Sequence, residues 1–277
     1  MVGKGLDLEL ASAVSIEAAE AAGALLREQA LGAFEVRSKG SGDDLVTELD
    51  LASEALIVSR LRRAFPAHRI VTEEAGELPG SGHWTWLVDP LDGTNNLAIG
   101  LAVFAVGIAL CELGLPMVSV VHDVPASTTW AARRGGGAHG PRGPLRICRP
   151  VRDRPLTLAW IQGHEVARND ALAVALKARL ERESKRVLGL WAPLLSWVMV
   201  ARGDIDGIVA YQAGGMDLHA GLLIAREAGI ETRCLDGGAF DERFASADDR
   251  YSLVAGSPAI VDRLLDLAAD ERTVSAK

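Results

Sequence analysis

The 277-residue chain contains few cysteines and few aromatic residues. Its three cysteines, Cys111, Cys148 and Cys234, lie far apart and form no Cys-x-x-Cys pair. This spacing excludes a disulfide framework and a thiolate zinc site, and it is typical of proteins from a reducing compartment. Aromatic residues make up 5% of the chain and charged residues 24%, which argues against a disordered or fibrous protein.

A long hydrophobic run and a surplus of basic residues are also absent. The longest apolar stretch, 97–111, is interrupted by glycines and is shorter than the ~18–20 residues that a membrane-spanning helix needs. The N-terminus becomes acidic at Asp7 before any apolar run develops, so we expect no signal peptide. Lysine and arginine number 29 against 37 acidic residues, a net charge of −8 that argues against a nonspecific nucleic-acid binder. We therefore expect a cytoplasmic protein that binds neither nucleic acid nor membrane.

Hydrophobic periodicity divides the chain into two parts. Residues 1–150 read as an α+β half, with helices over 7–31 and 47–64 followed by several strands. Residues 151–277 alternate between strand and helix, as in α/β proteins. The sequence therefore predicts an α+β protein built from two halves.

Acidic residues gather beside structure-breaking residues in three segments. Glu73 and Glu74 follow a short strand, the string Asp-Pro-Leu-Asp-Gly-Thr at 89–94 ends a longer strand, and Asp217 precedes an apolar helix. Oxygen-only ligands of this kind select hard cations such as Mg²⁺ or Mn²⁺ over zinc. The six histidines show no metal-ligand spacing, so the pattern indicates magnesium.

Each segment also has a purely structural interpretation. Asp217 stands where a helix N-cap is expected, and Thr47 with Asp50 forms a capping box. The glutamate pair could be a solvated loop end, and the 89–94 string a simple turn. It is the joint presence of the segments that favours a functional site.

Together the segments resemble the inositol monophosphatase family. The resemblance rests on the glutamate pair, on the 89–94 string, and on Asp217 followed by Ala220-Gly221 and 227–229 (Glu-Ala-Gly). It extends over nearly the whole chain and includes Lys39, the 44–50 segment and the 202–207 turn. This family belongs to the lithium-sensitive, magnesium-dependent phosphatases, together with the fructose bisphosphatases. The resemblance thus implies a layered α/β/α/β/α sandwich of the inositol monophosphatase / fructose bisphosphatase type.

Transferred to this chain, the resemblance implies two or three Mg²⁺ ions per site, with Mn²⁺ as a substitute. Glu73, Asp89 and the Leu91 carbonyl would hold one ion, and Asp89, Asp92 and Asp217 a second. Glu73 would contribute to a third, weaker ion. The charge agrees with this ligand set, because four carboxylates in one cleft require cations or large upward pKa shifts.

The same resemblance implies in-line water attack at phosphorus. Two ions ~3.5–4 Å apart would hold the attacking and leaving oxygens. Backbone N–H groups of Gly93 and Thr94 would bind the phosphate. Glu73 and Thr94 would orient the water, and Asp92 and Thr47 complete the candidate catalytic residues.

Asp217 would lie near the leaving alkoxide and bind this side of the substrate. A covalent aspartyl-phosphate mechanism is the competitor, and its two aspartates usually stand two residues apart. Here Asp89 and Asp92 are three apart, with a proline between them. We therefore favour direct water attack.

Residues expected to select the substrate depart from the family pattern. Relatives place a tryptophan just before the metal-binding aspartate and a sugar-binding glutamate several residues earlier, whereas this chain has Met216 and Ala210. Their polar Arg-Ser-x-Gly-Ser/Thr-Ala stretch is replaced by the apolar 187–193 segment.

Two interpretations of this apolar segment remain open. Trp191 and Trp197 either pack a helix into the core, or Trp191 lines a pocket for a less hydroxylated alcohol, a nucleoside or an amino-alcohol phosphate. His164, in a loop after a strand, is another candidate contact with the substrate.

Two functions of different classes follow from these observations. One is a Mg²⁺-dependent phosphomonoesterase for a small phosphorylated metabolite (a sugar, cyclitol, nucleoside or amino-alcohol phosphate), with histidinol phosphate and 3′-phosphoadenosine 5′-phosphate as alternatives. The other is a catalytically silent relative that acts through protein association. Retention of every ligand-type residue favours the enzyme. Relatives are commonly dimers, so the resemblance implies a homodimer.

Overall fold

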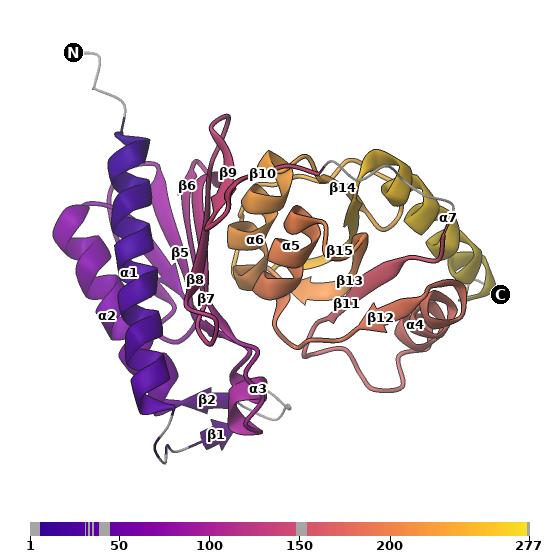
Figure 1. Cartoon of the computed structure of the whole chain (residues 1–277), viewed down its shortest axis with the longest axis horizontal. Coiled ribbons are helices and arrows are strands. Elements are labelled where there is room, and N and C mark those ends of the chain that lie inside the picture. Colours follow the sequence, from indigo (N-terminus) through magenta and orange to yellow (C-terminus); the bar gives the residue numbers. More distant parts are fainter. Residues whose placement is uncertain are drawn as a thin grey trace.

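The layers of the protein follow the order α/β/α/β/α (Figure 1). Helices α1 (Leu8–Gln29) and α2 (Glu48–Ala64) cover the outer face of an eight-stranded sheet. Helices α5 (Pro193–Arg202) and α6 (Met216–Glu227) lie between this sheet and a five-stranded one, whose far face is covered by α4 (Ala171–Glu183) and α7 (Pro258–Ser275). This order confirms the expected sandwich. The computed structural model describes residues 6–30, 32, 34, 36–38, 45–147 and 154–275.

The larger sheet brings two expected site segments to one edge. Its order is β10-β9-β8-β7-β6-β5-β3-β4. The strands are β3 (Arg69–Thr72), β4 (Glu77–Leu78), β5 (Trp84–Asp92), β6 (Ala105–Glu112), β7 (Leu115–Asp123), β8 (Thr128–Arg133), β9 (Gly137–Gly140) and β10 (Gly143–Leu145). Strands β3 and β5 run parallel, so both end at the same edge. Helix α3 (Thr94–Ala98) follows β5 there, beside the hairpin of β1 (Val36–Ser38) and β2 (Leu45–Thr47) (Figure 1).

The smaller sheet has the order β12-β11-β13-β15-β14. Its strands are β11 (Thr157–Gln162), β12 (Arg186–Leu188), β13 (Gly207–Gly214), β14 (Glu231–Cys234) and β15 (Arg250–Gly256). Strand β11 is parallel to both of its neighbours, and β15 is antiparallel to β13. The β13–β15 ladder is irregular between Ala210 and Ala213.

Five short strands, β2, β4, β9, β10 and β14, were not predicted from the sequence. They are two to four residues long, and Gly137–Gly140 and Glu231–Cys234 carry little of the β-branched and aromatic content that marks a strand. They pair through their backbones near the edges of the sheets. The expected boundary near residue 150 lies outside the described residues.

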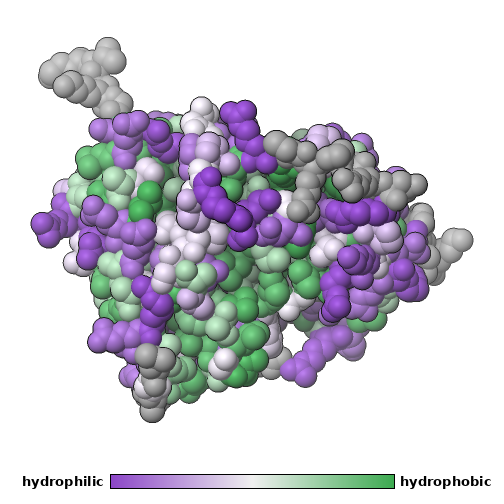
Figure 2. Space-filling model, viewed as in Figure 1, coloured by the Kyte–Doolittle hydropathy of each residue, from purple (hydrophilic) through white to green (hydrophobic). Residues whose placement is uncertain are grey.

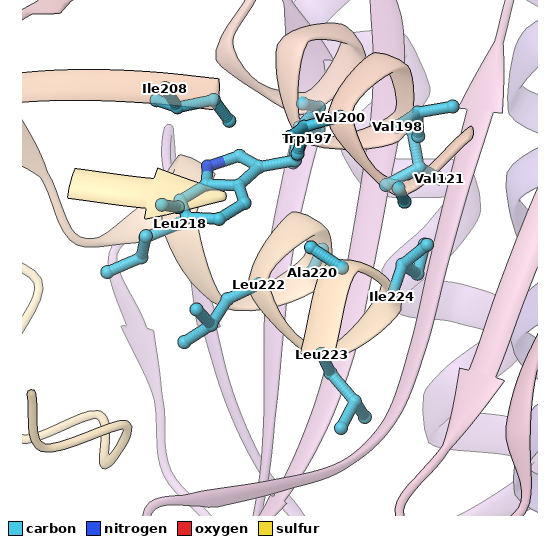
Figure 3. Close-up of a cluster of buried hydrophobic side chains, with 14 of the residues drawn as sticks. Val121, Trp197, Val198, Val200, Ile208, Leu218, Ala220, Leu222, Leu223 and Ile224 are labelled. Carbon is cyan, nitrogen blue, oxygen red and sulfur yellow. The ribbon is translucent and has the colours of Figure 1, made fainter. Parts of the chain in front are cut away.

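Helices α5 and α6 form the centre of the core because each has a sheet on both sides. Consecutive α6 residues such as Leu222, Leu223 and Ile224 are all at most 2% exposed. Figure 3 shows the Trp197 ring of α5 extending over α6 on its Leu218 side. A Cβ at Gly221 would lie 2.4 Å from the Trp197 Cβ, so the glycine permits the close contact of the two helices.

The exposed surface is mixed. On the face in Figure 2, hydrophilic side chains are spread over both halves, with apolar areas between them. None of the helices in the described ranges combines the length and the apolar character needed to cross a membrane.

Three histidines are buried in the fold. His68, His122 and His219 are 9%, 2% and 0% exposed. Desolvation on burial lowers the pKa of each imidazole below its usual value, and the nearby Arg27 guanidinium adds to the effect at His122. The folded protein therefore favours the neutral form of all three side chains.

We expect the free energy of unfolding to decrease as the pH falls from 7.5 to 5.5. Unfolded histidines titrate near pH ~6.5, so the unfolded chain binds more protons than the folded chain below that pH. Urea unfolding at several pH values measures the effect. His122→Gln should weaken the pH dependence, whereas His139→Gln, at an exposed position, should leave it unchanged. A stability that is constant or increases over this range would contradict the assignment.

Candidate active site

The end of β5 carries two buried aspartates. Asp89 pairs with Gly107 of β6 and Asp92 with Ala105, so three steps on β5 match two on β6. On a regular strand, residues three apart point to opposite faces of the sheet. The extra residue of the bulge allows Asp89 and Asp92 to point to the same face. The side chains of Asp89 and Asp92 are 3% and 5% exposed. The Leu91 N–H donates to Asp89 Oδ1 at 3.1 Å, which stabilises the bulge at Pro90.

Both aspartates belong to the face that α5 and α6 cover. A Cβ at Gly107, the partner of Asp89, would lie 2.5 Å from Leu194 Cδ1, and directly paired residues share a face of the sheet. The Leu194 N–H donates to Asp92 Oδ2 at 2.8 Å. This places the carboxylate at the N-terminus of α5, where the helix dipole favours negative charge.

The glutamate pair lies next to Asp89. Thr72 of β3 is in register with Val88 of β5, so the next residues along these parallel strands, Glu73 and Asp89, are neighbours. The Glu54 carboxylate of α2, 6% exposed, accepts the N–H groups of Glu74 at 2.9 Å and Ala75 at 3.1 Å. Glu54 thus fixes the loop that carries Glu73. Glu54 was not predicted from the sequence, although an acidic residue on the sheet-facing side of an expected helix was an available signal.

The capping box at Thr47 is confirmed, and it also contacts the start of α3. Asp50, 0% exposed, accepts the N–H and the hydroxyl of Thr47 at 2.7 and 2.6 Å on Oδ2. Its Oδ1 lies 2.9 Å from Thr94 Oγ1, which is equally close to the Leu91 carbonyl. Thr94 has one hydroxyl proton for these two acceptors. The structural and the functional interpretation of Thr47 and Asp50 are therefore compatible.

Gly93 joins β5 to α3 with a left-handed backbone, φ +94°. A Cβ there would lie 2.8 Å from the Val103 carbonyl, so a side chain is excluded by contact as well as by conformation. From α3, Asn96 Nδ2 donates to the Val103 and Leu190 carbonyls, each at 2.7 Å. The loop before α5 is thereby held to the segment that carries Gly93 and Thr94.

Asp217 lies inside the first turn of α6, whose N-cap is Gly215. The expected N-cap position for Asp217 was wrong, because the helix begins at Met216 and its N-cap, Gly215, lies two residues before Asp217. The side chain of Asp217 lies outside the described part of the structure. His219, two residues on, donates from Nδ1 to the Gly215 carbonyl at 2.8 Å. Burial lowers its pKa, so the neutral ring stabilises this helix start.

The donors fit a hard cation in their chemistry. Glu73, Asp89 and Asp92 are carboxylates, and the Leu91 carbonyl adds a neutral oxygen at the same strand end. The described side chains form no ready-made group of three or more His, Cys, Asp or Glu ligands, and the expected set also needs Asp217. These residues could hold Mg²⁺ once their carboxylates converge on it.

The three expected substrate contacts occupy different environments. Ala210 is buried in β13, His164 is exposed in the turn after β11, and Trp191 is 51% exposed with a left-handed backbone, φ +54°. Core packing is thus confirmed for Trp197, 1% exposed, and is wrong for Trp191.

A small apolar hollow lies between α5, α6 and the smaller sheet. Its lining residues are Ile161, Pro193, Trp197, Ala210, Ala213, Gly214 and Leu218.

Comparison with known proteins identifies the class to which this fold and site belong. The model of the inositol monophosphatase family matches residues 7–270. The chain belongs to the inositol monophosphatase family.

Similar proteins carry two kinds of name. Nus factor SuhB of Escherichia coli K12 is 33% identical over 272 residues, covering 95% of this chain and 97% of the relative. An inositol-1-monophosphatase of Mesorhizobium japonicum is 30% identical over 245 residues, covering 88% and 89%. Among solved structures, an inositol monophosphatase from Anabaena superposes with a TM-score of 0.81 at 28% identity, covering 96% of this chain and 97% of the other.

We expect Gly107→Ala to destabilise the protein by about 1–3 kcal/mol, because its Cβ would overlap the buried Leu194 side chain. The cost should largely disappear in a Leu194→Ala background, which provides the space. A double-mutant cycle by urea unfolding measures the coupling. Gly189→Ala, with no atom within 4 Å of the added Cβ, is the control. Equal costs of Gly107→Ala in both backgrounds would refute the proposed close contact.

Proposed function

We propose that this protein is a Mg²⁺-dependent phosphomonoesterase that hydrolyses a small phosphorylated metabolite. The observation that supports the proposal is that the parallel strands β3 and β5 end side by side, so that the segments carrying Glu73, Asp89, Leu91 and Asp92 lie at the same edge of the sheet, in a chain of this family. Asp217 completes the proposed ligand set. Two or three bound Mg²⁺ ions, or Mn²⁺ in their place, would supply Lewis acidity and lower the pKa of the attacking water.

The residues around this edge have distinct proposed roles. Glu73 orients the attacking water. Thr94, whose hydroxyl oxygen lies 2.9 Å from Asp50, can accept a proton from that water while donating its own to the carboxylate. Thr47 donates to the other Asp50 oxygen and so sets the orientation of this acceptor. Gly93 contributes its N–H, with that of Thr94, to binding of the phosphate oxygens.

The second half closes the site at the side of the leaving group. The α5 N-terminus holds Asp92 through the Leu194 N–H, and Asp217 begins the neighbouring helix. Asp217 is proposed to lie beside the leaving alkoxide. His164 and Trp191 remain proposed contacts with the alcohol. From the family pattern we also propose lithium inhibition, a homodimer and a cytoplasmic location.

A second candidate function is supported by the names of the relatives. The E. coli relative is named a Nus factor and not a phosphatase, although it matches over 95% of this chain. This favours, as the alternative, a catalytically silent member that acts through protein association. Phosphate release separates the two functions, because only the enzyme requires the carboxylates for turnover.

Asp92→Asn should lower turnover by at least about two orders of magnitude, because it removes a charged ligand at the N-terminus of α5. The measurement is phosphate release from a panel of sugar, nucleotide and amino-alcohol phosphates with Mg²⁺ and with EDTA. Asp248→Asn, at an exposed loop position, should leave the rate unchanged. Full activity in EDTA, or in Asp92→Asn, would refute the metal site. Absence of Mg²⁺-dependent release from every ester would favour the silent alternative.

Glu54→Gln should raise the Mg²⁺ concentration needed for half-maximal activity by about tenfold, because the amide group cannot accept both loop N–H groups. A magnesium titration at saturating substrate measures this shift. Glu48→Gln, an exposed change on the same helix, is the matched control. If both variants give the wild-type curve, Glu54 does not position the Glu73 loop.

A further inference from the structure

The hollow between α5, α6 and the smaller sheet lies directly beside the proposed site. Pro193, in its wall, precedes the residue whose N–H holds Asp92. Leu218, also in its wall, follows Asp217. The hollow is therefore within one residue of Asp217 and within one residue of the Leu194 N–H that holds Asp92, on the side where Asp217 is proposed to meet the leaving alkoxide.

Two alanines of β13 leave the space that forms the hollow. Ala210 is in parallel register with Ile161 of β11, and both line it. The ladder then shifts between Ala210 and Ala213, where Gln212 has a left-handed backbone, φ +50°. Ala213 belongs, with Ala210, to the core cluster that includes α5 and α6. The irregularity thus keeps two small side chains on one wall.

The opposite wall is rigid and aromatic. Trp197 of α5 is 1% exposed and packs against Gly221, where a Cβ would lie 2.4 Å away. Figure 3 shows its ring between Ile208 of β13 and Leu218 of α6. A tight contact of this kind prevents the ring from moving aside to admit a larger polar group.

The lining carries no charged group and no hydroxyl. Its side chains are aliphatic apart from the Trp197 indole, and Gly214 adds none. A ring with several hydroxyls would lose their hydration here without finding acceptors, whereas an apolar group would gain from burial. Ala210 stands where the family resemblance implies a sugar-binding glutamate, so the main polar acceptor for such a ring is missing.

We propose that this hollow binds the apolar part of the leaving alcohol, so that the substrate is the phosphomonoester of an alcohol with an aliphatic or aromatic group and few hydroxyls. The inference rests on the proposed phosphatase function and specifies its substrate class. In the hydrolysis, a P–O bond forms to water as the P–O bond to the alcohol breaks. The alcohol oxygen takes up one proton, which balances the proton that the attacking water releases to Thr94 and Asp50, and inorganic phosphate is the second product.

Straight-chain alkyl monophosphates from ethyl to hexyl test this directly, because their leaving groups differ little in basicity. We expect kcat/KM with Mg²⁺ to rise by up to about fourfold per methylene until the hollow is filled. Glycerol 1-phosphate should be a poorer substrate than propyl phosphate. myo-Inositol 1-phosphate should be poorer than hexyl phosphate.

Two substitutions locate the effect in the hollow. Ala213→Leu fills it and should flatten the chain-length series, whereas Ala171→Leu, exposed at the start of α4, should preserve the series. Ala210→Glu adds an acceptor and should raise kcat/KM for myo-inositol 1-phosphate relative to hexyl phosphate by at least about tenfold. Thermal unfolding checks that each variant is folded. If a variant is unfolded, the chain-length dependence of kcat/KM in the wild-type protein tests the apolar site.

The outcomes separate the inference from the function on which it rests. If no ester is hydrolysed with Mg²⁺, the proposed function is wrong. If esters are hydrolysed but kcat/KM is independent of chain length, or is highest for myo-inositol 1-phosphate, the function stands and the apolar site is overturned. A chain-length series that persists in folded Ala213→Leu would overturn the location.

Discussion

The hydrogen bond from the Leu194 N–H to Asp92 Oδ2 joins the two halves of the protein at the proposed site. It is 2.8 Å long and buried, and it bridges 102 positions of sequence. A carboxylate that is 5% exposed would be costly without such a donor. The start of α5 supplies both the N–H and a favourable helix dipole, so the position of α5 and the state of Asp92 are linked. Trp197 and Pro193 are on the same helix, and the hollow therefore depends on this contact as well.

Glycines make this arrangement sterically possible. Gly107 opens a space on the larger sheet for Leu194, and Gly221 opens one on α6 for Trp197. Each side chain that enters belongs to α5, which is thereby fixed from two directions. Bulky side chains of α5 thus pack against glycines on its two neighbours, and this packing fixes the Leu194 N–H that binds Asp92.

Local features were predictable from the sequence, and contacts over long distances were not. The 89–94 string and the capping box at Thr47 follow from patterns within a short window, whereas the order of the layers was implied by the family resemblance. The roles of Glu54 and Leu194 depend on partners 20 and 102 positions away, which periodicity does not reveal. Trp191 and Trp197 are the same residue type, yet their side chains are 51% and 1% exposed. They differ because only Trp197 lies on the helix face between the two sheets.

The metal-binding and alcohol-binding ends of the proposed site are built from different parts of the fold. Carboxylates at the ends of β3 and β5 form the first, and core-facing residues of β11, β13, α5 and α6 form the second. Ala210 and Ala213 belong to the central core cluster, so their size determines both packing and the space left for an alcohol. A change at these positions can therefore alter the preferred alcohol while the carboxylates stay in place. Membership of the family accordingly indicates the chemistry at phosphorus, whereas the choice of alcohol must be read from the packing of this core.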